Sequence, residues 1–293
     1  MSQSASVVAQ AKINLLLRVL ARETTGYHSI ETIFLRLELG DDVRVRIANR
    51  RSLDCTGPAM PPHGLGPIER NLAYRAAVAY ADTTGWPSGF AIEVMKRIPA
   101  GGGLGGGSAD AGAVLRALDA LAPNPLGTRL VELGTALGAD VPFMSTEHPM
   151  ALAWGRGERI LPLRPLDPRP IALVVPGFPV GTADAYGWLS TDRGRYVPEA
   201  HVIAPESFAT WESAAAAAAN DFESVVARRH PVLTEYVEAL ESAGAALAMM
   251  SGSGSTVFGV FDDAPTRGAL SNFGTVPVTL TRTAASVARV RVD

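Results

Sequence analysis

The sequence predicts an α+β protein, because strand-like and helix-like patterns are mixed along the whole chain. In the first half, residues 33–39 and 90–94 alternate apolar and polar side chains as strands do. Apolar residues at three- and four-residue spacing over 111–121 indicate an amphipathic helix. Prolines then cluster at 164–170, and new strands and helices follow. A chain of 293 residues is long enough for two domains, expected at 1–163 and 164–293.

The first predicted strand, residues 7–20, has one apolar and one partly polar face. The apolar face carries Ile13, Leu15, Leu17 and Val19, and the opposite face carries Lys12, Asn14 and Arg18. Polar residues spaced by two on such a strand either line a cleft or form a solvated outer face. This segment alone leaves both interpretations open.

Further elements follow from periodicity and from turn residues. We expect strands at 33–39, 43–47, 90–94, 151–154, 160–163, 171–175, 245–250, 256–261, 276–280 and 287–292. We expect helices at 71–81, 111–121, 128–137, 182–189, 214–219, 231–243 and 265–272, the first capped by Asn71. Segment 49–70 is rich in proline and glycine and is expected to be a loop, and 190–205 is polar and irregular.

A glycine-rich segment lies between the strand at 90–94 and the helix at 111–121. Residues 98–110 read Ile-Pro-Ala-Gly-Gly-Gly-Leu-Gly-Gly-Gly-Ser-Ala-Asp. Glycine permits positive φ and close approach of a ligand, and a helix start adds unpaired N–H groups, so this context predicts a phosphate site. Ser108 is expected to cap the helix or to contact a phosphate. A flexible linker is the weaker interpretation, because linkers are not usually wedged between a strand and a helix.

The glycine segment does not match the common nucleotide loops. Gly101, Gly103 and Gly106 satisfy the G-x-G-x-x-G pattern, but the next 20 residues hold helix patterns and prolines, without a second strand that ends in an acidic residue. No lysine follows the glycines, as a P-loop requires, and the protein-kinase signatures are missing. The sequence therefore predicts a phosphate loop of another class.

Composition excludes several function classes. A net charge of −3 argues against a broad electrostatic grip on nucleic acid or on a membrane surface. The single cysteine, Cys55, forms no internal disulfide, which fits a reducing cytoplasm. The five histidines lack metal-ligand spacing, and the N-terminus lacks the basic start of a signal peptide. We expect a cytoplasmic protein that binds neither nucleic acid nor membranes and has no resident metal site.

Two shorter motifs are ambiguous when taken alone. Tyr27 and His28 follow Gly26 and form either a surface turn or a ring for stacking beside an imidazole for hydrogen bonding. Asp140, in Gly-Ala-Asp-Val-Pro-Phe at 138–143, is most simply a turn or cap carboxylate. Neither motif fixes a function without its neighbours.

Together, five motifs in this order resemble one family over nearly the whole chain. They are Ala-Lys-Ile-Asn-Leu at 11–15, Gly-Tyr-His at 26–28, the glycine segment at 99–108, Gly-Ala-Asp-Val-Pro-Phe at 138–143 and Ser-Gly-Ser-Gly at 251–254. The chain resembles the GHMP small-molecule kinases, which include galactokinase, homoserine kinase and mevalonate kinase. The resemblance implies an N-terminal domain with a left-handed βαβ crossover, a ferredoxin-like C-terminal domain and an active site between them.

The resemblance also implies a role for each matching residue. Lys12 and Asp140 match the catalytic pair, and Asp140 either takes the hydroxyl proton or mainly orients the hydroxyl. The residues matching a substrate site for a cytidine diphosphate-linked polyol are Asn14, Tyr27, His28, Asp140 and Tyr186. Those matching an ATP site are Asn71, Lys96, Pro99, Gly101, Gly102, Gly103, Leu104, Gly105, Gly106, Gly107, Ser108 and Ala109. Mg²⁺ is expected to arrive with the nucleotide. Ala109 stands where the family usually has a second serine, so one hydroxyl contact is missing.

Other functions stay open at this point. A kinase of the same family acting on homoserine or mevalonate, and a catalytically silent nucleotide-binding module, are the alternatives. The presence of both Lys12 and Asp140 argues against the silent module. We expect a monomer or a weak homodimer.

Overall fold

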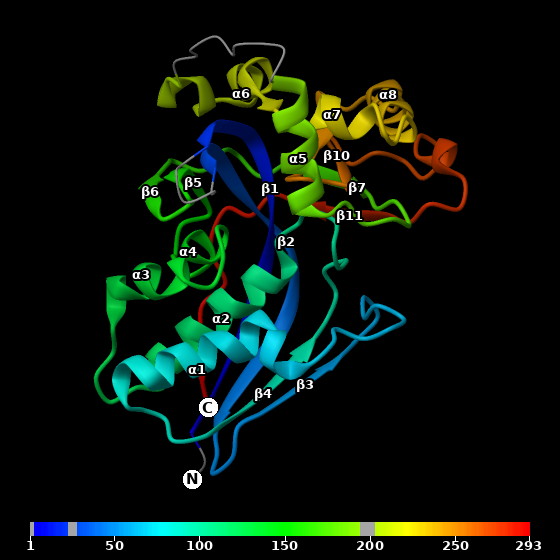
Figure 1. Cartoon of the computed structure of the whole chain (residues 1–293). Helices are drawn as coiled ribbons and strands as arrows, with labels where there is room; N and C mark the ends of the chain where they lie inside the picture. The colour runs from blue at the N-terminus through cyan, green and yellow to red at the C-terminus, as the bar shows by residue number, and fades with distance from the viewer. Residues whose placement is uncertain (1–2, 23–27, 194–202) are drawn as a thin grey trace.

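The computed structural model describes residues 3–22, 28–193 and 203–293 of the chain. Two β-sheets and the helices packed on them form the molecule, as Figure 1 shows. The larger sheet has eight strands and the smaller has four. The α+β class is therefore confirmed. Among the described residues, no helix is long and apolar enough to cross a membrane.

Two long antiparallel strands, β1 (Ser4–Arg22) and β2 (His28–Ile47), form the backbone of the larger sheet. Its main path runs β12-β1-β2-β4-β3, with β4 at Phe90–Met95 and β3 at Ser52–Thr56. The free edge of β2 pairs first with β5 (Met150–Gly155) and then with β4. Strand β6 (Arg159–Pro162) extends β5.

The strands expected at 33–39 and 43–47 are one strand, so the prediction of a break between them is wrong. Gly40 lies at this point, and a Cβ there would meet Val8 Cγ1 at 2.5 Å and Ala9 O at 2.9 Å. This glycine therefore serves close approach of β1 and does not form a turn. Asp41 follows it with a fully buried side chain.

Part of the loop expected at 49–70 is a strand. Residues Ser52–Thr56 form β3, which pairs in parallel with β4. Helix α1 (Leu72–Thr84) lies between them in sequence, and Asn71 caps it as predicted, accepting a hydrogen bond from Ala73 N at 2.9 Å. The left-handed sense expected for this βαβ unit stays a prediction.

The main core lies between the larger sheet and four helices. These helices are α1, α2 (Gly106–Leu121), α3 (Leu130–Thr135) and α4 (Val141–Met144), and α1 and α2 lie side by side in Figure 1. Fully buried Ile13, Phe34 and Leu115 belong to this core. Burying each such side chain contributes roughly 1.5–3 kcal/mol, and this packing holds α2 against β1 and β2.

The smaller sheet runs β11-β7-β10-β9 and is antiparallel throughout. Its strands are β7 (Pro170–Val174), β9 (Leu247–Met250), β10 (Val257–Val260) and β11 (Val278–Arg282). Numbered in chain order, they lie 4-1-3-2, the order of a ferredoxin-like sheet. Helices α5 (Thr182–Arg193), α6 (Trp211–Ala217), α7 (Glu223–Ala227) and α8 (Val232–Ser242) belong to this half.

The prediction of a helix at 265–272 is wrong. The structure has turns there and a short 3-10 helix, Ser271–Phe273. Gly268 interrupts the segment and only Phe273 of the 3-10 turn is buried, so packing does not offset the weak helix propensity.

The second half of the chain contributes two short strands to the larger sheet. Strand β8 (Ala219–Asn220) pairs in parallel with β1, and β12 (Arg291–Val292), a shortened form of the strand expected at 287–292, pairs with the start of β1. Both lie beyond residue 164 in sequence yet belong to the larger sheet. The division at 163/164 stays a prediction.

Candidate active site

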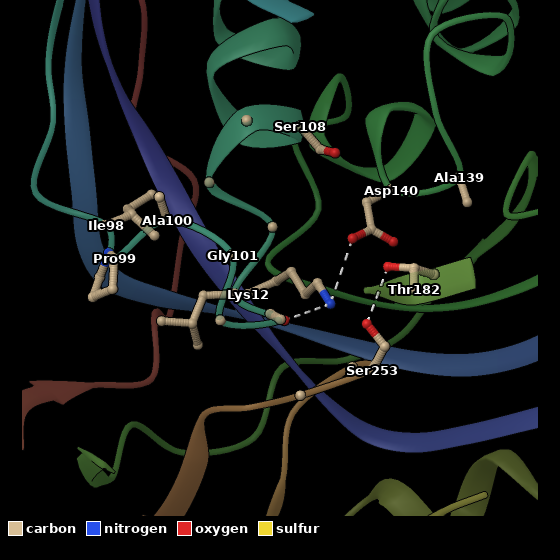
Figure 2. A pocket seen from close by; sticks show the side chains of 18 of the residues that line it. Lys12, Ile98, Pro99, Ala100, Gly101, Ser108, Ala139, Asp140, Thr182 and Ser253 are labelled. Carbon is tan, nitrogen blue, oxygen red and sulfur yellow. Dashed lines mark hydrogen bonds and ion pairs between the residues drawn. The ribbon is translucent and has the colours of Figure 1, made fainter. Parts of the chain in front are cut away.

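A cavity of about 470 Å³ lies between the glycine segment, the middle of β1 and the start of α5. Figure 2 shows side chains from these elements converging on it. Most of the site residues expected from sequence line this cavity: Lys12, Asn14, Asn71, Lys96, Pro99, residues 101–107, Ser108, Asp140 and Tyr186. Segments that lie far apart in sequence, from Lys12 to Gly254, therefore build one site.

The glycine segment follows β4 and makes close backbone contacts with the turn at 251–254. Gly101, Gly103 and Gly105 have φ values of 74°, 77° and 71°. A Cβ on Gly103 would stand 2.1 Å from Ser251 O, while Ser251 Oγ donates to Gly103 O at 3.1 Å. Any other residue at Gly103 would meet both a steric clash and an unfavourable backbone conformation.

Helix α2 begins at Gly106, and Gly105 occupies its N-cap position. Ser108 therefore lies within the first turn and does not cap the helix, contrary to one of its two expected roles. Its side chain lies beside the cavity in Figure 2. Ala109 is buried in the core and its N–H bonds Gly105 O at 2.8 Å, so this residue has no contact left for a phosphate.

The Lys12 side chain points from β1 into the cavity and is only 3% exposed. Its Nζ donates to Asn14 Oδ1 at 2.6 Å and to Gly103 O at 3.0 Å, and it lies 3.4 Å from Asp140 Oδ2. Figure 2 shows the ammonium between the glycine segment and the carboxylate. The polar face of this strand therefore lines a cleft, and the solvated-face interpretation is wrong for these residues.

Asp140 directly precedes α4, but its side chain makes no capping hydrogen bond. The carboxylate is 28% exposed and faces Lys12 across the cavity. A purely structural cap does not describe it. A carboxylate beside an ammonium and open to the cavity can orient a hydroxyl group and accept its proton.

Asn14 lies next to this pair, but its amide is already engaged within the protein. Its Oδ1 accepts from Lys12, and its Nδ2 donates to Thr32 Oγ1 at 2.7 Å. Thr32 in turn donates to Leu16 O at 2.7 Å. In this arrangement Asn14 orients Lys12, which the sequence pattern did not indicate.

The aromatic part of the site comes from both halves of the chain. Tyr186 of α5 stacks on His28, with ring centroids 4.6 Å apart and planes at 13°, and meets Phe222 edge-on at 4.9 Å. Burial, helped by the charge of Asp140, raises the pKa of Tyr186 to about 12, so its phenol keeps its proton at neutral pH. Tyr27 lies outside the described residues, and one face of Tyr186 is covered by His28.

Asn71 and Lys96 line the cavity, yet the protein itself uses their polar groups. Asn71 Oδ1 caps α1, and Lys96 Nζ donates to Asp41 and, at 2.6 Å, to Asp110 Oδ2. Contacts with an adenine base would need the remaining atoms of these side chains.

Sequence reasoning did not single out several residues of the cavity. Phe34 lies under the ammonium of Lys12, with its ring centroid 5.5 Å from Nζ. Thr182 Oγ1 and Ser253 Oγ lie 3.1 Å apart and connect α5 to the turn at 251–254, as Figure 2 shows. Ser253 lay within a motif that the resemblance used, whereas Phe34 and Thr182 carried no local signal.

The described residues contain no group of three or more His, Cys, Asp or Glu side chains that could hold a metal ion.

Comparison with family models places the chain among known proteins. Residues 71–152 match the model for the GHMP kinases N terminal domain, and residues 205–273 match that for the GHMP kinases C terminal region. The first match includes the glycine segment and Asp140.

Individual relatives agree with these matches. A protein of Geobacter sp. (strain M21) named 4-diphosphocytidyl-2-C-methyl-D-erythritol kinase is 39% identical, over 88% of this chain and 89% of the relative. One of Anaeromyxobacter dehalogenans (strain 2CP-C) with the same name is 41% identical, over 89% of this chain and 81% of the relative. A crystal structure of 4-(cytidine 5'-diphospho)-2C-methyl-D-erythritol kinase has a TM-score of 0.73 at 34% identity and covers 95% of this chain and 99% of that one. A homoserine kinase from Cytophaga hutchinsonii, with a TM-score of 0.60 at 16% identity and coverage of 99% and 97%, shares the fold.

Proposed function

Because the chain belongs to the GHMP kinase family, we propose that it phosphorylates a hydroxyl of 4-diphosphocytidyl-2-C-methyl-D-erythritol with ATP, giving the 2-phosphate. This reaction belongs to non-mevalonate isoprenoid precursor synthesis. The names of relatives at 38–41% identity support this substrate. A cytoplasmic location and a monomeric or weakly dimeric state belong to the same proposal.

The observation that carries the proposal is the Lys12–Asp140 pair, which lies beside the glycine segment in one cavity. Phosphoryl transfer needs little covalent chemistry from a protein and depends on alignment and on charge stabilisation. A cradle of backbone N–H groups, a buried cation and a partly exposed carboxylate supply these two requirements.

Each part of the site has a distinct role in this mechanism. Backbone N–H groups of the glycine segment and the N-terminus of α2 bind the β- and γ-phosphates. Lys12, held by Asn14 and Gly103 O, offsets the negative charge that develops on the transferred group. Asp140 orients the acceptor hydroxyl and accepts its proton. Mg²⁺ bound to the nucleotide neutralises part of the phosphate charge.

The cytidine base belongs at the aromatic cluster of His28, Tyr186 and Phe222. The family resemblance assigns Tyr27 and Tyr186 to the substrate site, and two such rings can hold the base between them. His28 covers one face of Tyr186, so a base can stack there only on the opposite face or after the imidazole moves aside. The imidazole edge then supplies the hydrogen bond that distinguishes cytosine from uracil.

The test is ADP release measured with ATP alone and with each acceptor in turn. The proposal expects rapid ADP release with the cytidine diphosphate-linked substrate, and background release with homoserine, with mevalonate and without an acceptor. Turnover with homoserine or mevalonate would assign a different member of the family. The absence of turnover with every acceptor, together with normal ATP binding, would indicate a silent nucleotide-binding module.

A further inference from the structure

Three buried charged side chains meet next to the glycine segment, where a Cβ on Gly106 would stand 3.7 Å from Lys96 Nζ. Asp41 of β2, Lys96 at the end of β4 and Asp110 of α2 are 0%, 3% and 3% exposed. Lys96 Nζ donates to Asp41 Oδ2 and to Asp110 Oδ2. The mechanism above uses none of these groups, although burying three charges is costly.

The contacts of this triad tie together the two ends of the glycine segment. Asp41 Oδ1 accepts from Arg97 N at 2.5 Å and from Ile98 N at 2.8 Å, so it holds the residues that enter the segment. Asp110 lies in the second turn of α2, just after the segment ends. The Lys96–Asp110 contact therefore closes a ring of chain around the phosphate cradle, and it fixes the separation of the two ends.

The triad also has an unbalanced charge. With all three groups ionised it carries two negative charges and one positive charge, next to a site for a polyanion. Asp110 Oδ1 is buried and has no hydrogen-bond partner, whereas both oxygens of Asp41 have donors. Lys96 and Asp110 both line the cavity. An unpartnered buried oxygen at this place is where a proton would neutralise the triad.

Electrostatics agree with this arrangement. Burial raises the pKa of Asp110 to about 8; Lys96 opposes the rise and Asp41 favours it. Burial also disfavours the charge on Lys96, but the two carboxylates outweigh it and hold the pKa of the ammonium above its usual range. Other described groups that face the triad include Cys55 of β3, where burial raises the pKa of the thiol to about 11, and Arg97, whose guanidinium pKa is raised by Asp42 and also by Asp41.

We propose that Asp41, Lys96 and Asp110 form a positioning clamp for the glycine segment. We further propose that the glycine segment binds ATP well only while this clamp holds one proton. The proton keeps the triad neutral, and its loss places a net negative charge behind the phosphate cradle. This inference rests on the proposed placement of ATP at the glycine segment. Its consequence is an ATP affinity that falls with rising pH, apart from any effect on the chemical step.

The test is calorimetric titration of the full-length protein with Mg²⁺-ATP, without acceptor, between pH 7.5 and 9.5. The wild-type Kd should rise on the order of tenfold over this range, with its midpoint near the pKa of about 8. In Asp110→Asn, which cannot ionise, the Kd should stay flat over the same range. Lys96→Met should raise the Kd at all pH values, because it leaves two carboxylates unpaired.

A matched control is Asp42→Asn, which removes a neighbouring acid of the same strand. Asp42 is exposed, pairs with Arg97 at 2.5 Å, and its carboxylate forms no ion pair with Lys96 among the described residues. This variant should keep the wild-type pH profile. A wild-type Kd that is constant from pH 7.5 to 9.5 would overturn the proposal without any variant having to fold, and so would an Asp110→Asn profile that still rises.

Failure of the clamp and failure of the ATP placement give different results. If Gly103→Ala abolishes ATP binding while the pH profile is flat, the placement stands and the clamp is wrong. If Gly103→Ala binds ATP normally, the glycine segment is not the nucleotide site, and the pH dependence would have to come from elsewhere.

Discussion

At the residue scale, the pair of Lys12 and Asp140 concentrates the chemistry in two side chains 3.4 Å apart. Asp140→Asn keeps the size of the side chain but removes the proton acceptor. We expect turnover to fall by about 10²- to 10⁴-fold, the range for a positioned acid–base group. The ATP Kd should barely change, because in this mechanism Asp140 acts on the acceptor hydroxyl and the glycine segment binds the phosphates. Steady-state kinetics together with calorimetry measure both quantities. Near-wild-type turnover in the folded variant would remove Asp140 from the mechanism.

Also at this scale, the stack of His28 on Tyr186 predicts how the base is recognised. Tyr186→Ala should raise the KM of the cytidine substrate by about 5- to 150-fold, because stacking on an aromatic ring contributes roughly 1–3 kcal/mol per base. The KM of ATP should stay the same. Tyr186→Phe is the matched control and should behave like the wild type, since it keeps the ring.

His28→Ala tests selectivity in the same pocket. The ratio of kcat/KM for the cytidine substrate to that for its uridine analogue should decrease, since uracil reverses a donor and an acceptor on the pairing edge. An unchanged ratio in this variant, or equal use of both analogues by the wild type, would place the base pocket elsewhere.

At the scale of elements, the glycine segment and the turn at 251–254 form one unit of touching backbones. Gly103→Ala adds only one methyl group, yet that Cβ would stand 2.1 Å from Ser251 O at a φ of 77°. We expect ATP binding to be lost and the melting temperature to fall. Gly187→Ala, on helix α5, is the control, because the Cβ added at Gly187 would meet no other group within 4 Å. Gly187→Ala should bind ATP like the wild type. Normal ATP binding by Gly103→Ala would show that the segment only connects β4 to α2.

At the scale of the whole molecule, Asn220 of β8 connects the two sheets. Its Nδ2 donates to Met250 O at 2.9 Å and to Gly252 O at 2.8 Å, and its Oδ1 accepts from Phe222 N at 3.0 Å. Asn220→Ala removes three hydrogen bonds of roughly 1 kcal/mol each, so it should lower the unfolding free energy by about 2–3 kcal/mol. It should also weaken ATP binding, because the turn at 251–254 loses its support against Gly103.

Denaturant unfolding and calorimetry on the same preparation measure both effects of Asn220→Ala. Thr191→Ala is the control, since it removes one exposed hydrogen bond, to Gly187 O at 2.9 Å, within a single helix. A loss of stability with unchanged ATP affinity would show that the turn keeps its position without Asn220.

The sequence by itself determined the elements that depend on local patterns. The strand at 90–94, the helix capped by Asn71 and the glycine segment between β4 and α2 follow from periodicity, capping and backbone freedom over short stretches. The sequence also predicted the chemistry of the site, because lysine and aspartate supply charge and a run of glycines permits close approach of a ligand. Matched in order, these motifs were sufficient to identify the family.

Only the tertiary structure decided how those pieces meet. Gly40 is a residue typical of turns, but here it allows close contact with β1. Strand β12, from the other end of the chain, pairs with β1. The stacking of His28 on Tyr186 and the burial of Lys96 between Asp41 and Asp110 join residues that are distant in sequence. Such contacts depend on which faces pack together, and a pattern confined to neighbouring residues carries no information about that choice.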